Sequence, residues 1–204
     1  NGDPEWEVHF RRTRAHNTVT IDGTDQAQHV SKMAWVRTYE TRLEAWSVLE
    51  GMTWTRGSHD GYARRESPVT HRRIAWLRPD GYVVLYDEIA GTARHDVEAT
   101  CQFAPGTLDL ASGARACFDD RFELSWLGTV PVHAVMSSGG PGPADGWIAP
   151  SLGVRQAAPR LVLRGSMVED RLVLLTVLAD RRRAIVRHVE RGGRGALRVS
   201  LTGE

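Results

Sequence analysis

Short stretches in which apolar and polar residues alternate, or in which β-branched and aromatic residues cluster, follow one another along almost the whole chain. Alternation with a period of two is typical of β-strands with one buried and one exposed face, and helical periodicity is nearly absent. We expect strands at residues 18–22, 29–36, 43–49, 73–77, 82–87, 97–103, 122–126, 161–164, 172–178, 184–189 and 197–201. The pattern therefore predicts an all-β chain.

Turn-forming residues separate these stretches. The clearest signal is Pro79-Asp80-Gly81, because proline presets one turn position and glycine accepts backbone angles that other residues avoid. A glycine-rich turn at 192–195 joins the last two expected strands. Residues 137–145 form one long loop, which is too short to link two domains. The spacing predicts a large antiparallel β-sandwich, with residues 1–204 as a single domain.

The composition agrees with a single soluble domain. The 204 residues are 41% hydrophobic, which is enough to bury a sizeable core. We find no run of about eighteen apolar residues and assign no intact signal peptide, so we expect no membrane span in this chain. The net charge is +1, without the concentrated basic face of a nucleic-acid-binding protein. We therefore expect neither nucleic acid nor membrane as a partner.

Cys101 and Cys117 lie in alternating stretches that can form neighbouring strands. This arrangement permits a disulfide bond but does not require one. Two small buried thiols are the alternative, and the absence of a Cys-x-x-Cys pair argues against a structural zinc site.

The first candidate site lies in the polar stretch 13–18, which runs directly into the first expected strand. His16 follows two arginines, Arg12 and Arg14, and precedes an amide side chain. Together with Asn17, these groups can bind a metal or the carboxylate of an acidic sugar. A histidine at a strand start that bonds only to backbone groups is the alternative. A metal needs more ligands, and no His-x-His or His-x-x-x-His pair lies nearby.

Two further stretches carry groups of chemical interest. His59 and Tyr62, within Ser-His-Asp-Gly-Tyr, offer the ingredients of proton transfer. Alternatively, the Asp-Gly pair forms a tight turn, the tyrosine packs and the histidine is solvated. His71 and Arg72 offer a cationic clamp, although alternation equally places basic groups on a solvent face. Trp147 is either a platform for sugar stacking or a buried loop anchor, and its apolar neighbours favour the anchor.

Taken together and in order, these segments resemble the C-terminal β-sandwich domain of the heparinase II/III-like polysaccharide lyases, a group that includes alginate and heparin lyases. The matching landmarks are Arg14-Ala15-His16-Asn17-Thr18 with Asp22-Gly23 and Gln26, His59-Asp60-Gly61-Tyr62, His71-Arg72-Arg73, Asp87 with Gly91 and His95, and Gly146-Trp147 with Gly153. Leu152 departs from the pattern, because the family usually has an aromatic residue before this glycine.

The resemblance implies a larger enzyme, in which an N-terminal α/α-toroid carries the catalytic asparagine, histidine and tyrosine and the sandwich completes the cleft. It implies a divalent metal, zinc or calcium, with His16 as one ligand. The other two ligands are expected before Asn1, so this chain alone should bind the metal weakly or not at all. The candidate substrate-binding residues are Arg12, Arg14, Asn17, His71 and Arg72. No catalytic residue is expected in this chain unless His59 or Tyr62 serves.

Two functions remain open. The first is the β-sandwich portion of a carbon-oxygen lyase that cleaves uronic-acid-containing polysaccharide by β-elimination. In such an enzyme this domain supports the metal and forms part of the substrate cleft, and it is expected to be inactive by itself. The alternative is a non-catalytic carbohydrate-binding or scaffold module of a lyase-like protein in exopolysaccharide metabolism. Both imply an acidic polysaccharide as partner and a bacterial protein that is secreted, periplasmic or at the cell surface.

Overall fold

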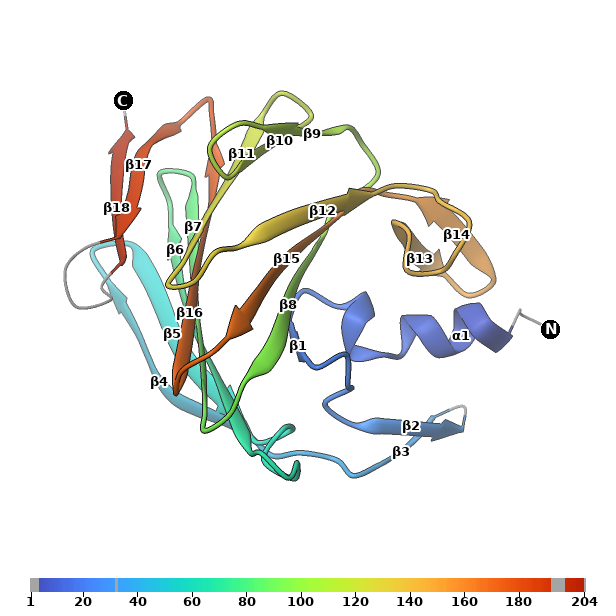
Figure 1. Ribbon diagram of the computed structural model, residues 1–204. Coiled ribbons are helices and arrows are strands. Elements are labelled where there is room, and N and C mark those ends of the chain that lie inside the picture. Colours follow the sequence, from blue (N-terminus) through green and yellow to red (C-terminus); the bar gives the residue numbers. More distant parts are fainter. Residues whose placement is uncertain (1–3, 32, 192–196, 204) are drawn as a thin grey trace.

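Two antiparallel sheets face each other in the computed structural model, which describes residues 4–31, 33–191 and 197–203 (Figure 1). The smaller sheet has the strand order β1 (Val19–Ile21), β8 (His95–Gln102), β15 (Arg160–Met167), β12 (His133–Ser137). The larger sheet has the order β4 (Thr41–Leu49), β5 (Met52–His59), β6 (Val69–Arg78), β7 (Tyr82–Gly91), β16 (Arg171–Asp180), β11 (Phe122–Gly128), β10 (Arg115–Phe118), β9 (Leu108–Ala111). This architecture confirms the predicted all-β antiparallel sandwich.

Smaller elements flank the sheets. Three hairpins are β2 (Gln28–Ser31) with β3 (Ala34–Val36), β13 (Trp147–Ser151) with β14 (Val154–Ala157), and β17 (Ala184–Arg191) with β18 (Leu197–Gly203). The described part of the chain starts with helix α1 (Pro4–Phe10) and a short 3-10 turn, η1 (Thr13–Ala15), which lead into β1 (Figure 1). Among the described residues, no helix combines the length and apolar character needed to cross a membrane.

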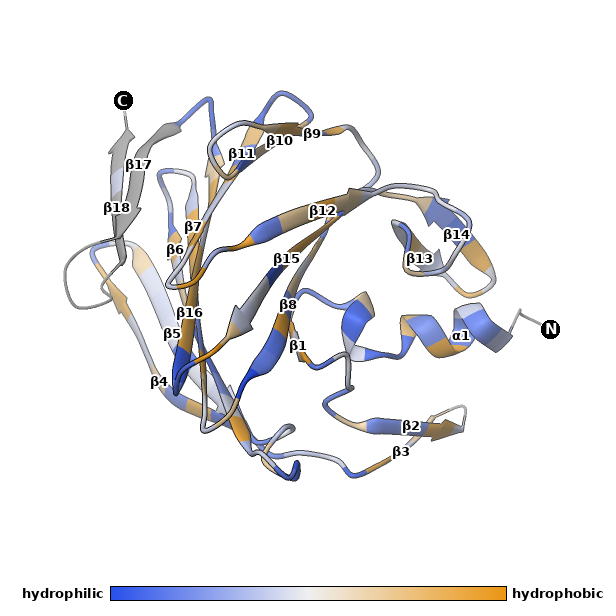
Figure 2. Cartoon of the chain, in the orientation of Figure 1, coloured by the Kyte–Doolittle hydropathy of each residue, from blue (hydrophilic) through white to orange (hydrophobic). Residues whose placement is uncertain are grey.

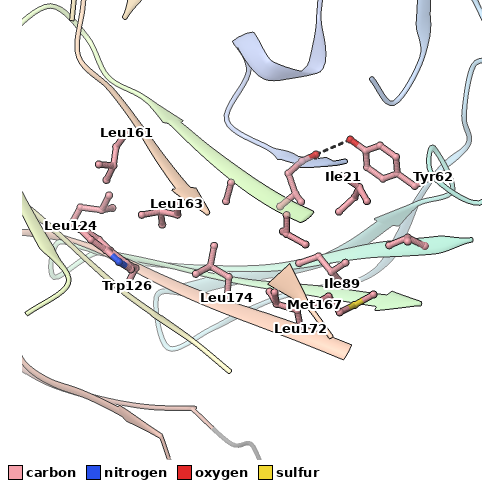
Figure 3. Packing of buried hydrophobic residues seen from close by; sticks show 14 of the residues in the cluster. Ile21, Tyr62, Ile89, Leu124, Trp126, Leu161, Leu163, Met167, Leu172 and Leu174 are labelled. Atoms are coloured by element: carbon pink, nitrogen blue, oxygen red, sulfur yellow. Dashed lines mark hydrogen bonds between the residues drawn. The ribbon is translucent and has the colours of Figure 1, made fainter. Parts of the chain in front are cut away.

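The main core fills the space between the two sheets. Alternate residues of each strand point inward, as the period of two requires. Figure 3 shows Ile21, Leu161 and Leu163 of the smaller sheet against a second set from the larger sheet: Ile89, Leu124, Trp126, Leu172 and Leu174. Strand β16 is hydrophobic over most of its length (Figure 2), because its other face packs in a second cluster with Tyr82 and Val84.

The turn at Pro79-Asp80-Gly81 is confirmed. Arg78 pairs with Tyr82 across the β6–β7 hairpin, and the amide of Gly81 donates to the carbonyl of Arg78 at 3.2 Å. Gly81 has a φ of +99°, a conformation that residues with a side chain rarely adopt.

Several expected boundaries were wrong. Residues 29–36 form the hairpin β2–β3 instead of one strand, with a register shift between His29 and Ser31. Strand β5 was missed because its serine, threonine and arginine residues hide the alternation. Helix α1 and strands β9, β10, β12, β13 and β14 were also missed, because each is seven residues or shorter and short elements carry little periodic signal. The expected turn at 192–195 lies outside the described residues.

The two cysteines are free, and they lie on strands of different sheets instead of on neighbouring strands. Cys101 lies on β8 of the smaller sheet and Cys117 on β10 of the larger one. Burial raises the pKa of the Cys101 thiol to about 11, so this thiol stays protonated and unreactive at neutral pH. The two thiols are therefore separate, as in the alternative, but both residues are only partly buried.

Candidate functional site

Three adjacent strands of the larger sheet bring a histidine pair and an Asp–Arg pair together. His59 ends β5 and lies directly opposite His71 on β6, while Arg73 on β6 lies opposite Asp87 on β7. His71, Arg73 and Asp87 point to the same face of the sheet because residues two apart on a strand share a face. The strand register thus brings three of the sequence landmarks, those that contain His59, His71 and Asp87, into one cluster.

Hydrogen bonds join the side chains of His59, His71, Asp87 and Arg73 into one continuous array. Nε2 of His59 lies 3.0 Å from Nδ1 of His71, whose Nε2 lies 2.7 Å from Oδ1 of Asp87. Arg73 donates to both oxygens of Asp87, from Nε at 2.7 Å and from Nη2 at 3.0 Å. Such bidentate, charge-assisted bonds are among the strongest in proteins. Both oxygens of the carboxylate are therefore engaged.

This environment keeps Asp87 ionised although only 1% of its surface is exposed. Burial alone would raise the pKa of the carboxyl group, but the hydrogen bond from His71 and the charge of Arg73 outweigh burial and lower it. A buried carboxylate held in this way is a rigid anchor for both partners.

Neither histidine of the cluster has a free ring nitrogen. Nδ1 of His59 accepts a hydrogen bond from the backbone amide of Gly61 at 3.1 Å. Its Nε2 faces His71 and lies 3.2 Å from the side-chain amide nitrogen of Gln26. Burial, together with the neighbouring His71 and Arg73, lowers the pKa of His59 to about 4. All four ring nitrogens of the two histidines are therefore engaged within the protein, and none is available to accept a proton from a substrate.

The array ends at the stretch that carries His16. Arg73 extends its Nη1 to the backbone carbonyl of Asn17 at 2.7 Å. The side chain of Asn17 is itself used in pairing, because its Oδ1 accepts from the amide of Gln102 on β8 at 2.6 Å. On the opposite side, the hydroxyl of buried Thr13 accepts from the amide of Gln26 at 2.9 Å. His16 lies exposed between these anchors.

Arg72, predicted beside His71 in a substrate site, points to the opposite face of the sheet. It bonds Glu44 at 2.9 Å and Glu88 at 3.0 Å, and Glu88 also pairs with Arg171. These contacts form an ionic ladder across β4, β6, β7 and β16. His71 and Arg72 therefore cannot grip one ligand together, because the period of two separates consecutive side chains.

Basic groups gather around α1 and η1, where η1 contacts β1 and β8 of the smaller sheet. His9 lies close enough to Arg160, Arg12, Arg14 and His16 that, together with burial as the larger effect, they lower its pKa to about 4. Arg14 donates to Glu98 at 2.6 Å, and Arg12 lies 3.7 Å from Asp25. Arg160 is buried and bonds the carbonyls of Ala144 and Arg14, and His9 is uncharged at neutral pH because of its low pKa. We therefore call the exposed or partly exposed side chains of Arg12, Arg14 and His16 the basic face.

Trp147 behaves as the anchor that its neighbours indicate. Its Nε1 donates to the carbonyl of Gly140 at 2.9 Å, and its ring meets Trp6 of α1 edge to face at 5.3 Å. The guanidinium of Arg155 stacks over Trp6 at 4.2 Å. The β13–β14 hairpin is thereby tied to the helix beside the basic face (Figure 1).

Tyr62 is 1% exposed, and its hydroxyl donates to the carbonyl of Val19 at 3.0 Å (Figure 3). Burial raises the pKa of the phenol above its usual range. The deprotonated form needed for a general base is thus disfavoured, and the residue packs against β1.

Two hollows lie near these groups. One, of about 440 Å³, is lined by His59, His71 and Arg73 together with Thr18 and Arg42, but the array already uses the hydrogen-bonding groups of the first three. The other, of about 570 Å³, is lined among others by His133, Arg164 and Glu98. Arg164 and Glu98 pair with each other at 3.0 Å, and none of the residues predicted for the site lines this hollow.

The described residues contain no group of three or more histidine, cysteine, aspartate or glutamate side chains that could hold a metal ion. His16 is exposed and can contribute one ligand. A complete metal site is therefore not formed by the described part of the chain.

Comparison with known proteins identifies the class. The model of the family described as Heparinase II/III-like, C-terminal, matches residues 1–188. The chain therefore belongs to this family of polysaccharide lyases, as the order of motifs indicated. No curated protein sequence matches it.

Solved structures with the same fold are much longer. A crystal structure of heparinase III matches with a TM-score of 0.68 and 17% identity, over 100% of this chain and 30% of its own. The heparan sulfate lyase HepC from Pedobacter heparinus matches with a TM-score of 0.68 and 13% identity, over 100% of this chain and 33% of its own. The chain thus spans about a third of the length of these structures.

Sequence reasoning left Arg73, Asp87 and Gln26 out of the candidate site residues, although all three belonged to the landmarks. A usable signal existed for one of them: Arg73 stands two residues after His71 and so shares its face. The contact with Asp87 depends on strand register, and the contact with Gln26 depends on the path of the loop between β1 and β2. No local pattern reports either.

Proposed function

We propose that this domain is the β-sandwich portion of a lyase that cleaves uronic-acid-containing polysaccharide by β-elimination. The observation that carries the proposal is the basic face, in which Arg12, Arg14 and His16 lie close together in the sequence and are exposed or partly exposed. A surface of this kind suits the carboxylate and sulfate groups of an acidic polysaccharide. Membership of the heparinase II/III-like family supports the same reaction class.

The reaction needs three events at the sugar. A cationic or amide group neutralises the C6 carboxylate, which makes the C5 proton removable. A base then takes that proton, and an acid protonates the departing O4 as the double bond forms. Arg12 and Arg14 are suited to the first event because their guanidinium groups bind carboxylates in a fork.

The base and the acid should come from another part of the enzyme. Tyr62 is buried with a raised pKa, and the ring nitrogens of His59 and His71 are engaged in the array. We assign both roles to an N-terminal α/α-toroid that packs against the basic face. By this proposal, residues 1–204 alone bind acidic polysaccharide without cleaving it.

His16 is proposed as one ligand of a divalent metal, zinc or calcium. The described residues offer no complete ligand set, so the proposal requires further ligands from outside these residues. Such an ion would add positive charge beside the substrate carboxylate. With an acidic polysaccharide as its substrate, we expect the protein to be secreted, periplasmic or at the cell surface.

Product formation tests the proposal. The native polypeptide that contains residues 1–204 is incubated with alginate, heparan sulfate, hyaluronan and other polyuronates, and the ultraviolet absorbance of unsaturated uronides is followed. Absorbance should rise with at least one of them. Binding without cleavage across the whole panel would instead favour a non-catalytic carbohydrate-binding module, and neither binding nor cleavage would refute both.

A further inference from the structure

His16 lies in a short stretch whose only regular structure is the turn η1. The residue is exposed and has an extended backbone, with a φ of −117° and a ψ of 158°. Its amide donates to the carbonyl of Thr13 at 3.1 Å, and its carbonyl accepts from the amide of Thr18 at 2.8 Å. The direction of the His16 side chain therefore depends on how the flanking residues are held.

Side chains of distant elements hold both flanks. The hydroxyl of Thr13 accepts a hydrogen bond from the backbone amide of Gln26. The side-chain oxygen of Asn17 accepts one from the backbone amide of Gln102 in the smaller sheet. The larger sheet reaches the stretch through Arg73, which donates from Nη1 to the carbonyl of Asn17 at 2.7 Å. That carbonyl lies one residue beyond His16.

The guanidinium of Arg73 uses two of its edges at once. One edge, Nε and Nη2, grips both oxygens of Asp87, and the other edge carries the bond to Asn17. Asp87 is in turn held by His71. The planar fork of arginine fits this arrangement, whereas the single ammonium of lysine cannot reproduce its geometry.

We propose that Arg73 is a positioning residue: its guanidinium is held by Asp87, which His71 supports, and it fixes the carbonyl of Asn17 and thereby the direction in which His16 is presented. The inference deepens the proposed function and rests on it for the role of His16 towards substrate and metal. Arg73 touches neither. It acts through the backbone, so its removal should loosen the stretch 14–18 while the two sheets stay intact.

Amide hydrogen exchange tests the positioning role without reference to activity. In Arg73→Lys, the amides of residues 15–18 that are measurable should exchange at least about ten times faster than in the wild type, because local opening becomes easier. Amides of β15 and β16 should be unchanged. Arg121→Lys is the matched control, since Arg121 also bonds a carboxylate, that of Asp180, at 2.8 Å, away from this stretch. Exchange as slow in Arg73→Lys as in the wild type would overturn the proposal.

Kinetics of the native polypeptide supply the functional readout. If His16 is presented by this array, Arg73→Lys should lower kcat at least about tenfold with little change in KM, as expected when a site group is misplaced. Arg121→Lys should keep both parameters. Unchanged kcat together with faster exchange would overturn the functional part of the proposal.

The two proposals fail in different ways. A wild-type polypeptide that cleaves no polyuronate refutes the proposed function, while the exchange comparison still decides whether Arg73 positions the stretch. If Arg73→Lys does not fold, His71→Gln weakens the support of Asp87 but keeps the Arg73 pair. It should then speed exchange at residues 15–18 by a smaller factor, and an unchanged rate there would contradict the proposal.

Discussion

Nε2 of His71 lies 2.7 Å from Oδ1 of Asp87, and both residues are almost completely buried. The same oxygen also accepts from Arg73. A buried carboxylate becomes costly when its partners are removed, because its charge then lacks compensation. The pair therefore explains why a histidine, an arginine and an aspartate on neighbouring strands belong together in this domain, as supports of the stretch that carries His16.

Replacement of His16 should remove metal from the native polypeptide. In His16→Ala one ligand is lost, and metal sites lose much of their affinity with each ligand. Elemental analysis of the purified protein measures the content. His133→Ala, which changes an exposed histidine on β12, should keep it. Equal metal content in His16→Ala and wild type would refute the assignment of His16 as a ligand.

Tyr62→Phe should lower the free energy of unfolding by about 1 kcal/mol, since the hydroxyl that donates to the carbonyl of Val19 is lost inside the core. Turnover by the native polypeptide should not change, because the phenol is buried. Urea unfolding and the rate of uronide formation check the two statements. A strong loss of turnover in a stably folded Tyr62→Phe would show that the phenol acts in the chemistry.

Stability should fall as the pH drops from about 6.5 towards about 4. Burial lowers the pKa of both His9 and His59 from 6.5 to about 4. In this interval the unfolded chain takes up protons that the folded protein does not, so acid favours unfolding. Each histidine contributes at most about 1.4 kcal/mol per pH unit. Urea unfolding at several pH values measures the slope.

Replacement of one histidine provides the control for the pH dependence. His59→Gln removes a titrating group but keeps an amide that can hydrogen-bond, so the loss of stability with acid should become shallower. An identical slope in His59→Gln and wild type would mean that His59 does not stay neutral in the folded protein.

Gly146→Ala should be more destabilising than Gly153→Ala. Both glycines have positive φ, +86° and +77°, so alanine is strained at either position, by about 1 kcal/mol. At Gly146 a Cβ would also lie 2.5 Å from the carbonyl oxygen of Ser137, whereas nothing lies within 4 Å at Gly153. Thermal unfolding of the two variants measures the difference. Equal losses would contradict the steric part of the argument.

The strands could largely be predicted because alternation is a local property. Residues 82–87 and 172–178 are predicted as strands from their own sequence, and they lie within β7 and β16. Strand β5 could not be recognised, since most of its residues are polar or only partly buried. The hairpin within 29–36 was missed because its turn at residues near Ser31 carries no glycine or proline signal.

The sequence by itself determined the fold class and the family, because strand periodicity and the order of motifs are both written along the chain. It also placed His16 and Asn17 just before the first strand, β1. Only the tertiary structure decided which motif residues share a site: it joined His59, His71 and Asp87, added Arg73 and turned Arg72 away. The physical reason is that strand register and sheet order, set by packing of the whole core, determine which side chains meet.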